Sequence, residues 1–282
     1  MYDILYRSAF PSKLNSIPDC PDRLNYIGEI GSDIFGKTLG VVGSRKMTSY
    51  GRRVVERLIG PLAASGVTIV SGFMYGVDSY AHEVCLDFGG RTIAVLPYGI
   101  RYKRPHYQRG LYERILDSGG LVISEFDEDF PPAPWTFPKR NRIVAGLSDA
   151  VLVVEAAQES GSLITADLCL KYGRKLFAAP GPIDSVVSEG TNFLIQKGAA
   201  EAVTSAEDIL RFFGLDGVRQ SGFQGSLEGD EKLIFNLLSA EPLNVDQISE
   251  KTGIDAATVG YKTMEMCLLG VLKEQGGRFY VC

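Results

Sequence analysis

The sequence predicts an α/β protein with an extended Rossmann-like open parallel sheet, followed by a small C-terminal winged-helix domain. Three observations predict this. Short apolar runs alternate with amphipathic stretches between residues 39 and 213, as in a chain of β-α-β units. Five glycines then interrupt the pattern between residues 214 and 229, which is typical of a linker. The remaining residues show three short helical patterns and one hairpin signal, as in a winged helix.

Six apolar runs are the strand candidates. Each is apolar almost throughout and most are rich in Val and Ile, as expected for parallel strands that are buried on both faces. They are residues 39–44, 67–71, 92–97, 120–125, 150–155 and 175–180. Helices are expected between them, near residues 49–65, 76–88, 107–118, 139–147 and 162–172. Because such crossovers join parallel strands, the alternation predicts a doubly wound sheet.

The domain boundaries follow from the same pattern. Residues 1–36 contain three prolines and little periodicity, so we expect an N-terminal arm there. The Rossmann-like domain is expected at 37–213, the linker at 214–227 and the winged helix at 228–282. In the winged helix, Gly276 and Gly277 separate two short β-type runs, which predicts a tight hairpin turn.

The composition fits a cytoplasmic globular protein. No apolar run reaches the ~18 residues of a membrane span, and the first residues do not resemble a secretory signal. Five scattered cysteines without a C-x-x-C pair argue against disulfides and structural zinc. With only two histidines, a His-rich metal site is not expected.

The net charge of −5 conceals an asymmetry. Residues 40–114 contain eleven Lys and Arg against five Asp and Glu, a net of +6, whereas residues 223–282 contain five against nine, a net of −4. A basic region in an acidic protein indicates an anion-binding face. Uneven decoration of a solvated surface is the alternative.

Small and basic residues follow the predicted strands. Ligands of open α/β sheets lie beyond the carboxyl ends of the strands, so these residues are the site candidates. They are Gly43, Ser44, Arg45 and Lys46 after the first strand, Lys139, Arg140, Asn141 and Arg142 before the fifth, and Ser160, Gly161 and Ser162 after the fifth.

Together these residues favour a polyanionic ligand. Helix N-termini offer free N–H groups and the positive end of the helix dipole, and the cations gather on the same edge. A nucleotide has too few charges for so many cations, whereas a strand of nucleic acid brings one phosphate per nucleotide. Trp135 and Phe137 lie among the cations and are candidates for stacking on unpaired bases.

Each assignment has a structural alternative. Arg45 could pair with a carboxylate at the helix start, and the serines at 160 and 162 could only cap a helix. Residues 141 and 142 could specify a helix start, and Trp135 and Phe137 could belong to the core.

Catalytic signatures are missing. The i, i+4 pair of Asp78 and His82 suggests a metal ligand or a general base, but no third ligand is evident, so a buried structural hydrogen bond is favoured. The sequence has no G-x-x-x-x-G-K-[ST], no G-x-G-x-x-G after the first strand, no G-x-S-x-G and no H-E-x-x-H. We therefore expect no catalytic activity, no cofactor and no metal.

Several longer segments resemble one family. They are VGSRKMTSYG, SGFMYGVDSYAH, FPKRNRIVAGLSDAVLVVEAAQESGSLITA, GRKLFAAPG and EGTNFLIQKGA. Their order and spacing over residues 10–213 resemble the DNA-processing protein A family (DprA/Smf). The resemblance implies single-stranded DNA binding without a nucleotide cofactor, dimerisation, and loading of the RecA recombinase during natural transformation. It implies a basic pocket at Gly43, Ser44, Arg45, residues 139–142 and residues 160–162.

The chain departs from the family pattern in three places. An N-terminal sterile-alpha-motif domain is common in the family, and only a short arm is found here. Met74 and Tyr75 replace a small residue and a frequently basic one, and the segment between Arg101 and Arg109 lacks the usual Asn and gains cations. The last two departures bear on DNA contacts.

The tail resembles the winged helix of the family but is acidic. Its third helical pattern, ATVGYKTMEMCLLG, has one lysine and one glutamate, whereas a helix that reads a DNA groove carries several basic and amide residues. We therefore expect a protein contact rather than duplex binding. A Rossmann-like nucleotide phosphoribohydrolase and a winged-helix transcription regulator are the alternative functions.

Overall fold

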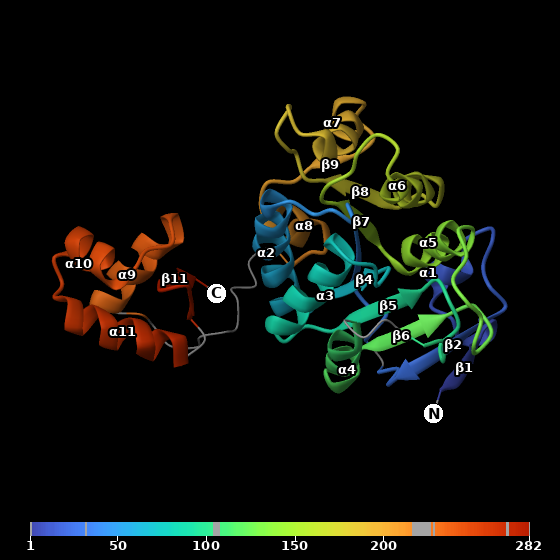
Figure 1. Cartoon of the computed structure of the whole chain (residues 1–282), viewed down its shortest axis with the longest axis horizontal. Helices are drawn as coiled ribbons and strands as arrows, with labels where there is room; N and C mark the ends of the chain where they lie inside the picture. Colours follow the sequence, from blue (N-terminus) through green and yellow to red (C-terminus); the bar gives the residue numbers. More distant parts are fainter. Residues whose placement is uncertain are drawn as a thin grey trace. The chain divides into compact units, whose positions relative to one another are not determined.

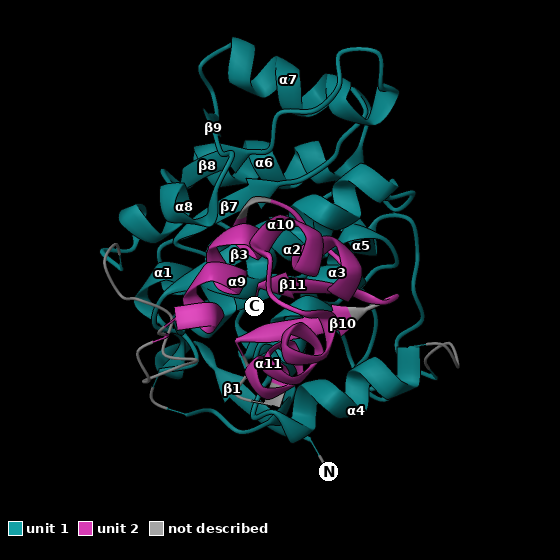
Figure 2. Ribbon diagram, turned by 90° about the vertical axis from the view of Figure 1, so that its left-hand side faces the viewer, with its two compact units in different colours: residues 1–216 teal, residues 217–282 magenta. Residues whose placement is uncertain are grey.

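The computed structural model describes residues 2–31, 33–103, 108–215, 227, 229–268 and 271–281. The chain forms two compact units, Met1–Asp216 and Gly217–Cys282 (Figure 2). The linker expected at 214–227 lies mostly outside the described residues.

A mixed, largely parallel sheet forms the centre of the first unit. Over the described residues it has nine strands in the order β1-β2-β6-β5-β4-β3-β7-β8-β9 (Figure 1). The six predicted strands all form, with ends at most two residues from the expected ones. The strands are β1 Asp3–Tyr6, β2 Arg23–Gly28, β3 Thr38–Val42, β4 Thr68–Ser71, β5 Thr92–Leu96, β6 Leu121–Ser124, β7 Ala150–Val153, β8 Lys175–Ala178 and β9 Glu201–Ala202.

Helices cover both faces of the sheet (Figure 1). Because side chains alternate along a strand, Ala150 and Leu152 of β7 join one apolar cluster, with α2, α3 and α8, while Val151 and Val153 join another, with α5 and α6. The helices are α1 Ser12–Asn15, α2 Ser49–Ala64, α3 Val77–Asp87, α4 Arg109–Asp117, α5 Thr136–Leu147, α6 Gly161–Lys171, α7 Glu189–Gln196 and α8 Ala206–Phe212, with 3-10 turns at Arg7–Ala9 and Val186–Ser188.

The strand order reverses beside β3. The chain runs from β3 outward through β4, β5 and β6 and then returns to β7, which pairs with the other edge of β3. The loops after β3 and β7 therefore diverge onto opposite faces of the sheet. A crevice at such a switch point is where open α/β sheets bind ligands.

The N-terminal segment is not a separate arm, contrary to the sequence prediction. β2 pairs antiparallel with β6, and β1 pairs antiparallel with β2, so both strands extend the sheet. The prediction was wrong because β2 is only half buried and contains polar residues: Asn25 is buried and donates its side-chain amide to the Phe126 carbonyl at 2.7 Å. Leu14 and Ile17 pack against Gly146 of α5.

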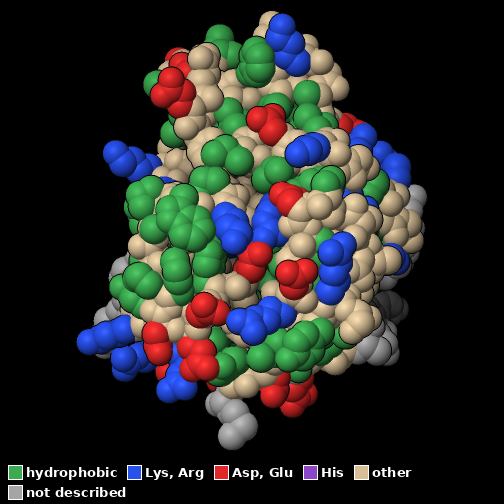
Figure 3. Space-filling model, turned by 90° about the vertical axis from the view of Figure 1, so that its right-hand side faces the viewer, with side chains coloured by type: hydrophobic (Ala, Val, Ile, Leu, Met, Phe, Trp, Pro, Cys, Tyr) green, Lys and Arg blue, Asp and Glu red, His purple; other side chains and the backbone are tan. Residues whose placement is uncertain are grey.

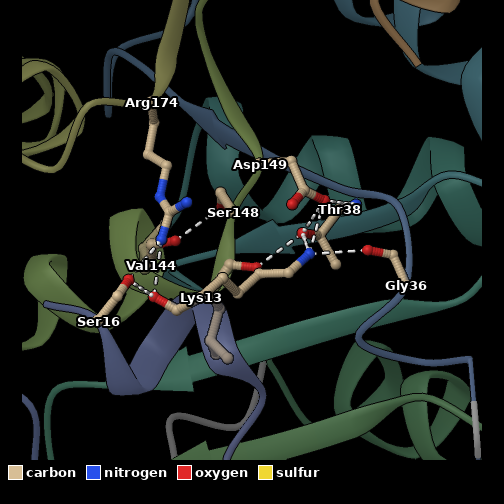
Figure 4. A network of polar contacts seen from close by, with 9 residues as sticks. Lys13, Ser16, Gly36, Thr38, Val144, Ser148, Asp149 and Arg174 are labelled. Atoms are coloured by element: carbon tan, nitrogen blue, oxygen red, sulfur yellow. Dashed lines mark hydrogen bonds and ion pairs between the residues drawn. The ribbon is translucent and has the colours of Figure 1, made fainter. Parts of the chain in front are cut away.

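A partly buried cation, Lys13, fixes this segment to the sheet (Figure 4). The Lys13 ammonium pairs with Asp149 at 2.6 Å and donates to the Gly36 carbonyl at 2.7 Å and the Thr38 hydroxyl at 2.9 Å. Burial lowers the pKa of Lys13. The Arg174 guanidinium donates to the Lys13 carbonyl at 2.8 Å. These contacts connect the short helix α1 to the start of β3 and to the loop before β8.

The second unit is a winged helix, as predicted. Its elements are α9 Gly229–Ala240, α10 Val245–Thr252, α11 Ala256–Leu268, β10 Leu272–Gln275 and β11 Arg278–Val281. Gly276 and Gly277 connect the two strands and have φ values of 62° and 75°, as a two-residue hairpin turn of this twist requires. A small apolar core that includes Ile234, Ile248 and Phe279 holds the helices and the hairpin together.

Candidate nucleic-acid interface

A cavity of about 940 Å³ opens at the switch point, beyond the carboxyl ends of β3 and β7. It is lined from one side by the loop after β3 and from the other by α5 and the start of α6. Nine of the residues expected from the sequence line it: Gly43, Ser44, Arg45, Phe137, Arg140, Asn141, Ser160, Gly161 and Ser162. The cavity therefore brings together all three segments that were selected from the sequence.

Contacts with buried residues fix the position of the loop after β3. Gly43 lies against Val77, where an added Cβ would meet the valine at 2.6 Å. Thr48 caps α2, and its backbone N–H donates to the Glu155 carboxylate at 3.0 Å. Glu155 is 1% exposed and sits beneath Gly51. This buried carboxylate was not among the residues expected from the sequence, although its motif had been noted, and it positions the segment that carries Arg45.

Arg45 lies between two aromatic rings. Its guanidinium carbon is 5.9 Å from the Tyr75 ring centre and 5.2 Å from that of Phe137. The side chain is exposed and forms no ion pair with an acidic group among the described residues. Cation–π contacts of this kind are worth about 0.5–1 kcal/mol at exposed sites. Arg45 is thus pre-oriented at the cavity, with its hydrogen-bond donors available to a ligand.

Arg140 contributes to the floor of the cavity, but most of its side chain is buried. Its side chain is 3% exposed and donates to the carbonyls of Gly72 and Val95. Burial lowers the pKa of Arg140 to about 10. Gly72 has to be a glycine here, because an added Cβ would stand 2.4 Å from the guanidinium. The arginine joins the ends of β4 and β5 to α5.

The N-terminus of α6 forms the opposite wall. Ser160 is its N-cap, and its hydroxyl accepts from the Ser162 backbone N–H at 3.3 Å. Asn141 donates its side-chain amide to the Gly161 carbonyl at 3.3 Å and so joins α5 to α6. Ser160 does cap the helix, and the start of this eleven-residue helix also presents N–H groups and the positive dipole end to the cavity.

Four expected site residues do not line the cavity. Arg142 is buried, donates to the Asp19 carbonyl and pairs with Glu125. Lys139 lies 3.6 Å from the same carboxylate and near the rings of Phe126 and Trp135. The remaining two are exposed Lys46 and Trp135.

Of residues 139–142, Arg140 and Asn141 line the cavity, whereas Lys139 and Arg142 do not. Successive residues of an α-helix are rotated by about 100°, so four in a row cannot share one face. Trp135 does not belong to the core, because it is 53% exposed and packs edge-on against Phe126 and Phe130.

Apolar residues supply much of the remaining wall. They include Met74, one of the departures from the family pattern, together with Pro132, Pro134, Pro138 and Ile164. Glu159 and Asp78 also line the cavity. Of the two arginines among its described lining residues, Arg45 is exposed and Arg140 is buried. On the side of the molecule drawn in Figure 3, basic and acidic side chains likewise alternate among apolar ones.

Asp78 and His82 have structural surroundings. The Thr92 hydroxyl donates its hydrogen to the Ile69 carbonyl at 2.7 Å. The oxygen of this hydroxyl therefore accepts a hydrogen bond from His82 Nδ1–H at 2.6 Å. Burial, with a smaller effect of Arg140, lowers the pKa of His82 to about 3. Burial raises the pKa of Asp78 to about 6, although Arg140 opposes the rise. His106 lies outside the described residues. Among the described residues, no three or more His, Cys, Asp and Glu side chains form a group that could hold a metal ion.

These two groups predict a pH effect on stability. The folded pKa of His82 lies below its unfolded value of 6.5, so its contribution is fully present above pH 6.5 and is lost as the pH falls toward 3. The folded pKa of Asp78 lies above its unfolded value of 3.8, so its contribution is present below pH 3.8 and is lost as the pH rises through 6. Between those values the two effects oppose each other.

We expect Asp78→Asn to make stability more sensitive to acid. Removing the opposing group leaves His82 uncompensated, so the free energy of unfolding should fall by an additional ~1.4 kcal/mol for each pH unit between about pH 6 and 4. Urea unfolding of both proteins over this range measures the difference in slope. Parallel curves would show that Asp78 is ionised in the folded state.

None of the helices in the described residues has the length and apolar character needed to cross a membrane.

Known proteins resemble the chain over both units. The family described as DNA recombination-mediator protein A matches residues 3–214, and the DprA winged helix domain matches residues 224–277. The Escherichia coli protein Smf is 40% identical over 279 residues, covering 96% of this chain and 74% of that protein.

Two solved structures share the fold. DNA processing protein A of Streptococcus pneumoniae is 38% identical, with a TM-score of 0.69 over 74% of each chain. The Helicobacter pylori protein, whose structure concerns its mode of binding single-stranded DNA, is 30% identical, with a TM-score of 0.69 over 77% of this chain and 97% of that one. Since the family match spans every strand of the large sheet, the chain belongs to the DNA recombination-mediator protein A family and carries the winged-helix domain of that family.

Proposed function

We propose that the chain binds single-stranded DNA and mediates its recombination. The observation that carries the proposal is the cavity at the switch point. Exposed Arg45, the N-terminus of α6 and a set of apolar side chains line it together. The relationship to the Helicobacter pylori protein supports the same ligand.

The two kinds of lining suit the two parts of a nucleotide. Arg45 presents a planar group that can donate two parallel hydrogen bonds to a phosphate, and the start of α6 offers further N–H donors. Phe137 and the three prolines offer flat apolar surfaces to bases. Bases in a duplex are already stacked and paired, so this wall favours single strands.

The proposed role is binding rather than catalysis. Of the titratable groups near the cavity, Asp78 is buried within the electrostatic influence of Arg140, and His82 is hydrogen-bonded to Thr92, which leaves neither placed as a general base beside a nucleophile. The proposed function therefore includes no covalent step.

The family relationship supports two further parts of the proposal. The bound strand would be delivered to the RecA recombinase during natural transformation in the cytoplasm, and the chain would act as a homodimer. Each is a property of the family that the sequence motifs imply.

The winged helix is proposed to contact protein rather than duplex DNA. Its third helix, α11, exposes Tyr261 and Met264, which are 67% and 53% exposed. The Lys262 ammonium is held by Glu231 at 2.6 Å and Glu265 at 3.5 Å. A groove-reading helix needs free cations and amides, whereas this helix offers apolar side chains and a neutralised lysine.

The proposal is tested by salt-dependent binding. We expect the full chain to bind a single-stranded oligonucleotide more tightly than the matching duplex between roughly 50 and 200 mM salt, with log affinity falling linearly with log salt concentration. A chain that ends at Leu215 should retain this preference. Equal affinity for the duplex, or binding that ignores salt, would refute the proposal. Release of free base from nucleoside monophosphates would instead favour the phosphoribohydrolase alternative.

A further inference from the structure

We propose that the outer face of α2 extends the DNA-binding surface beyond the cavity. In this arrangement a single strand leaves the cavity past Arg45 and Lys46, and its next phosphates lie against Arg53 and Arg57. The inference rests on the proposed function, since it requires that DNA occupies the cavity.

The helix is continuous with the cavity wall. The loop that lines the cavity with Gly43, Ser44 and Arg45 leads through Lys46 directly into α2, which begins at Ser49. Arg53 and Arg57 are four residues apart on this helix, so they share one face and lie about 6 Å apart along its axis. Both side chains are exposed, as is Lys46.

The cations on this face are free of carboxylates. Lys46, Arg53 and Arg57 form no ion pair with any described acidic residue. The acidic residue of the helix, Glu56, accepts a hydrogen bond from the Tyr80 hydroxyl of α3. Its charge is therefore turned toward α3 and away from the arginine face.

Exposed cations elsewhere on the same unit are often paired. Arg23 pairs with Asp127 at 3.1 Å, Arg101 with Glu128 at 3.0 Å and Arg114 with Asp87 at 2.7 Å. The unpaired arginines of α2 thus differ from much of the surrounding surface.

Helix-end electrostatics do not account for these arginines. A helix dipole acts mainly on charges in the first turn, whereas Arg53 and Arg57 are the fifth and ninth residues of α2. The first turn of α2 has no acidic residue, and Arg52 and Arg53 follow it immediately. Arg52 packs over the Tyr80 ring at 4.3 Å, whereas Arg53 and Arg57 form no such contact with a described aromatic residue. A bound polyanion would supply the ion-pair partners that these two arginines lack among the described residues.

The test compares oligothymidylates of two lengths. A strand of about 6 nucleotides would fill the cavity, whereas one of about 20 would also reach α2. The variant Arg53→Gln/Arg57→Gln keeps long polar side chains on the helix and removes two charges. For the long strand its salt slope should be smaller by about 1.4, which is about a tenfold loss of affinity at roughly 200 mM salt. Binding of the short strand should be unchanged.

A matched variant controls for net charge. Lys37→Gln/Lys171→Gln also removes two exposed cations, from the start of β3 and the end of α6, and should leave the slope for the long strand unchanged. The inference fails if the α2 variant keeps the parent slope on the long strand, or if both double variants lower it equally. An equal loss on both strand lengths would also overturn it. If the parent binds neither strand, the proposed function itself is wrong.

Discussion

We expect Arg45→Ala to lower the affinity for single-stranded DNA by about 1–2 kcal/mol, or roughly five- to thirtyfold. The substitution removes the exposed cation of the described cavity lining and with it one phosphate contact. It also removes the side chain that separates Tyr75 from Phe137. Fluorescence anisotropy across a salt series measures both effects, and the salt slope should fall by roughly 0.7–1 unit.

Two variants separate the cavity from nonspecific charge. Arg45→Lys keeps the charge but loses the planar guanidinium, so it should restore the salt slope and only part of the affinity. Lys171→Ala removes an exposed cation at the far end of α6 and should bind as the parent does. Parent-like affinity of Arg45→Ala at every salt concentration would contradict the assignment of the cavity.

The second large effect is expected from Arg140→Met. Methionine has nearly the length of arginine but no donors, so the Gly72 and Val95 carbonyls would lose the guanidinium and Asp78 would lose its buried cation. Leaving two buried carbonyls without their donor, and a buried carboxylate without a nearby compensating charge, costs about 3–5 kcal/mol. Urea unfolding near neutral pH, where Asp78 is mostly ionised, should show a decrease of this size.

An exposed pair supplies the comparison for Arg140. Arg101 and Glu128 are 3.0 Å apart at the surface, so Arg101→Met should cost about 1 kcal/mol or less. Adding Asp78→Asn to Arg140→Met removes the unpaired carboxylate and should recover part of the lost stability. A loss for Arg140→Met no larger than that for Arg101→Met would mean that Arg140 is not anchored as described.

The sheet could be predicted from sequence where strands are buried on both faces. The run AVLVVE at 150–155 is apolar because helices cover both sides of β7. β1 and β2 gave no such signal, since each is partly exposed at the edge of the sheet. The pairing of β2 with β6 depends on contacts between residues about a hundred positions apart, which local patterns do not encode.

Gly190 shows a use of glycine that the sequence does not reveal. It lies within α7 rather than in a turn. An added Cβ there would stand 2.7 Å from the Ala156 carbonyl, so the glycine permits close approach of a helix to the backbone. Sequence alone does not distinguish this use of glycine from a turn.

Which segments form the site could be predicted, but not every residue in it. The carboxyl ends of parallel strands meet at one edge, which brought the segments of Ser44 and Ser160 together as expected. The contacts of Lys139 and Arg142 depend on the rotation of α5 about its axis. That rotation is set by Leu14 and Ile17 against Gly146, and these partners come from the segment that the sequence did not assign to the sheet.

The attachment of the N-terminal strands also has a consequence for biosynthesis. β2 adjoins β6, and Lys13 pairs with Asp149, so β2 and Lys13 cannot reach their final neighbours until about a hundred or more further residues have been made. Until then the nascent chain must keep the two edge strands and Leu14 unassembled, at translation speeds of about 5–20 residues per second. Completion of the large unit is therefore a late event in its synthesis.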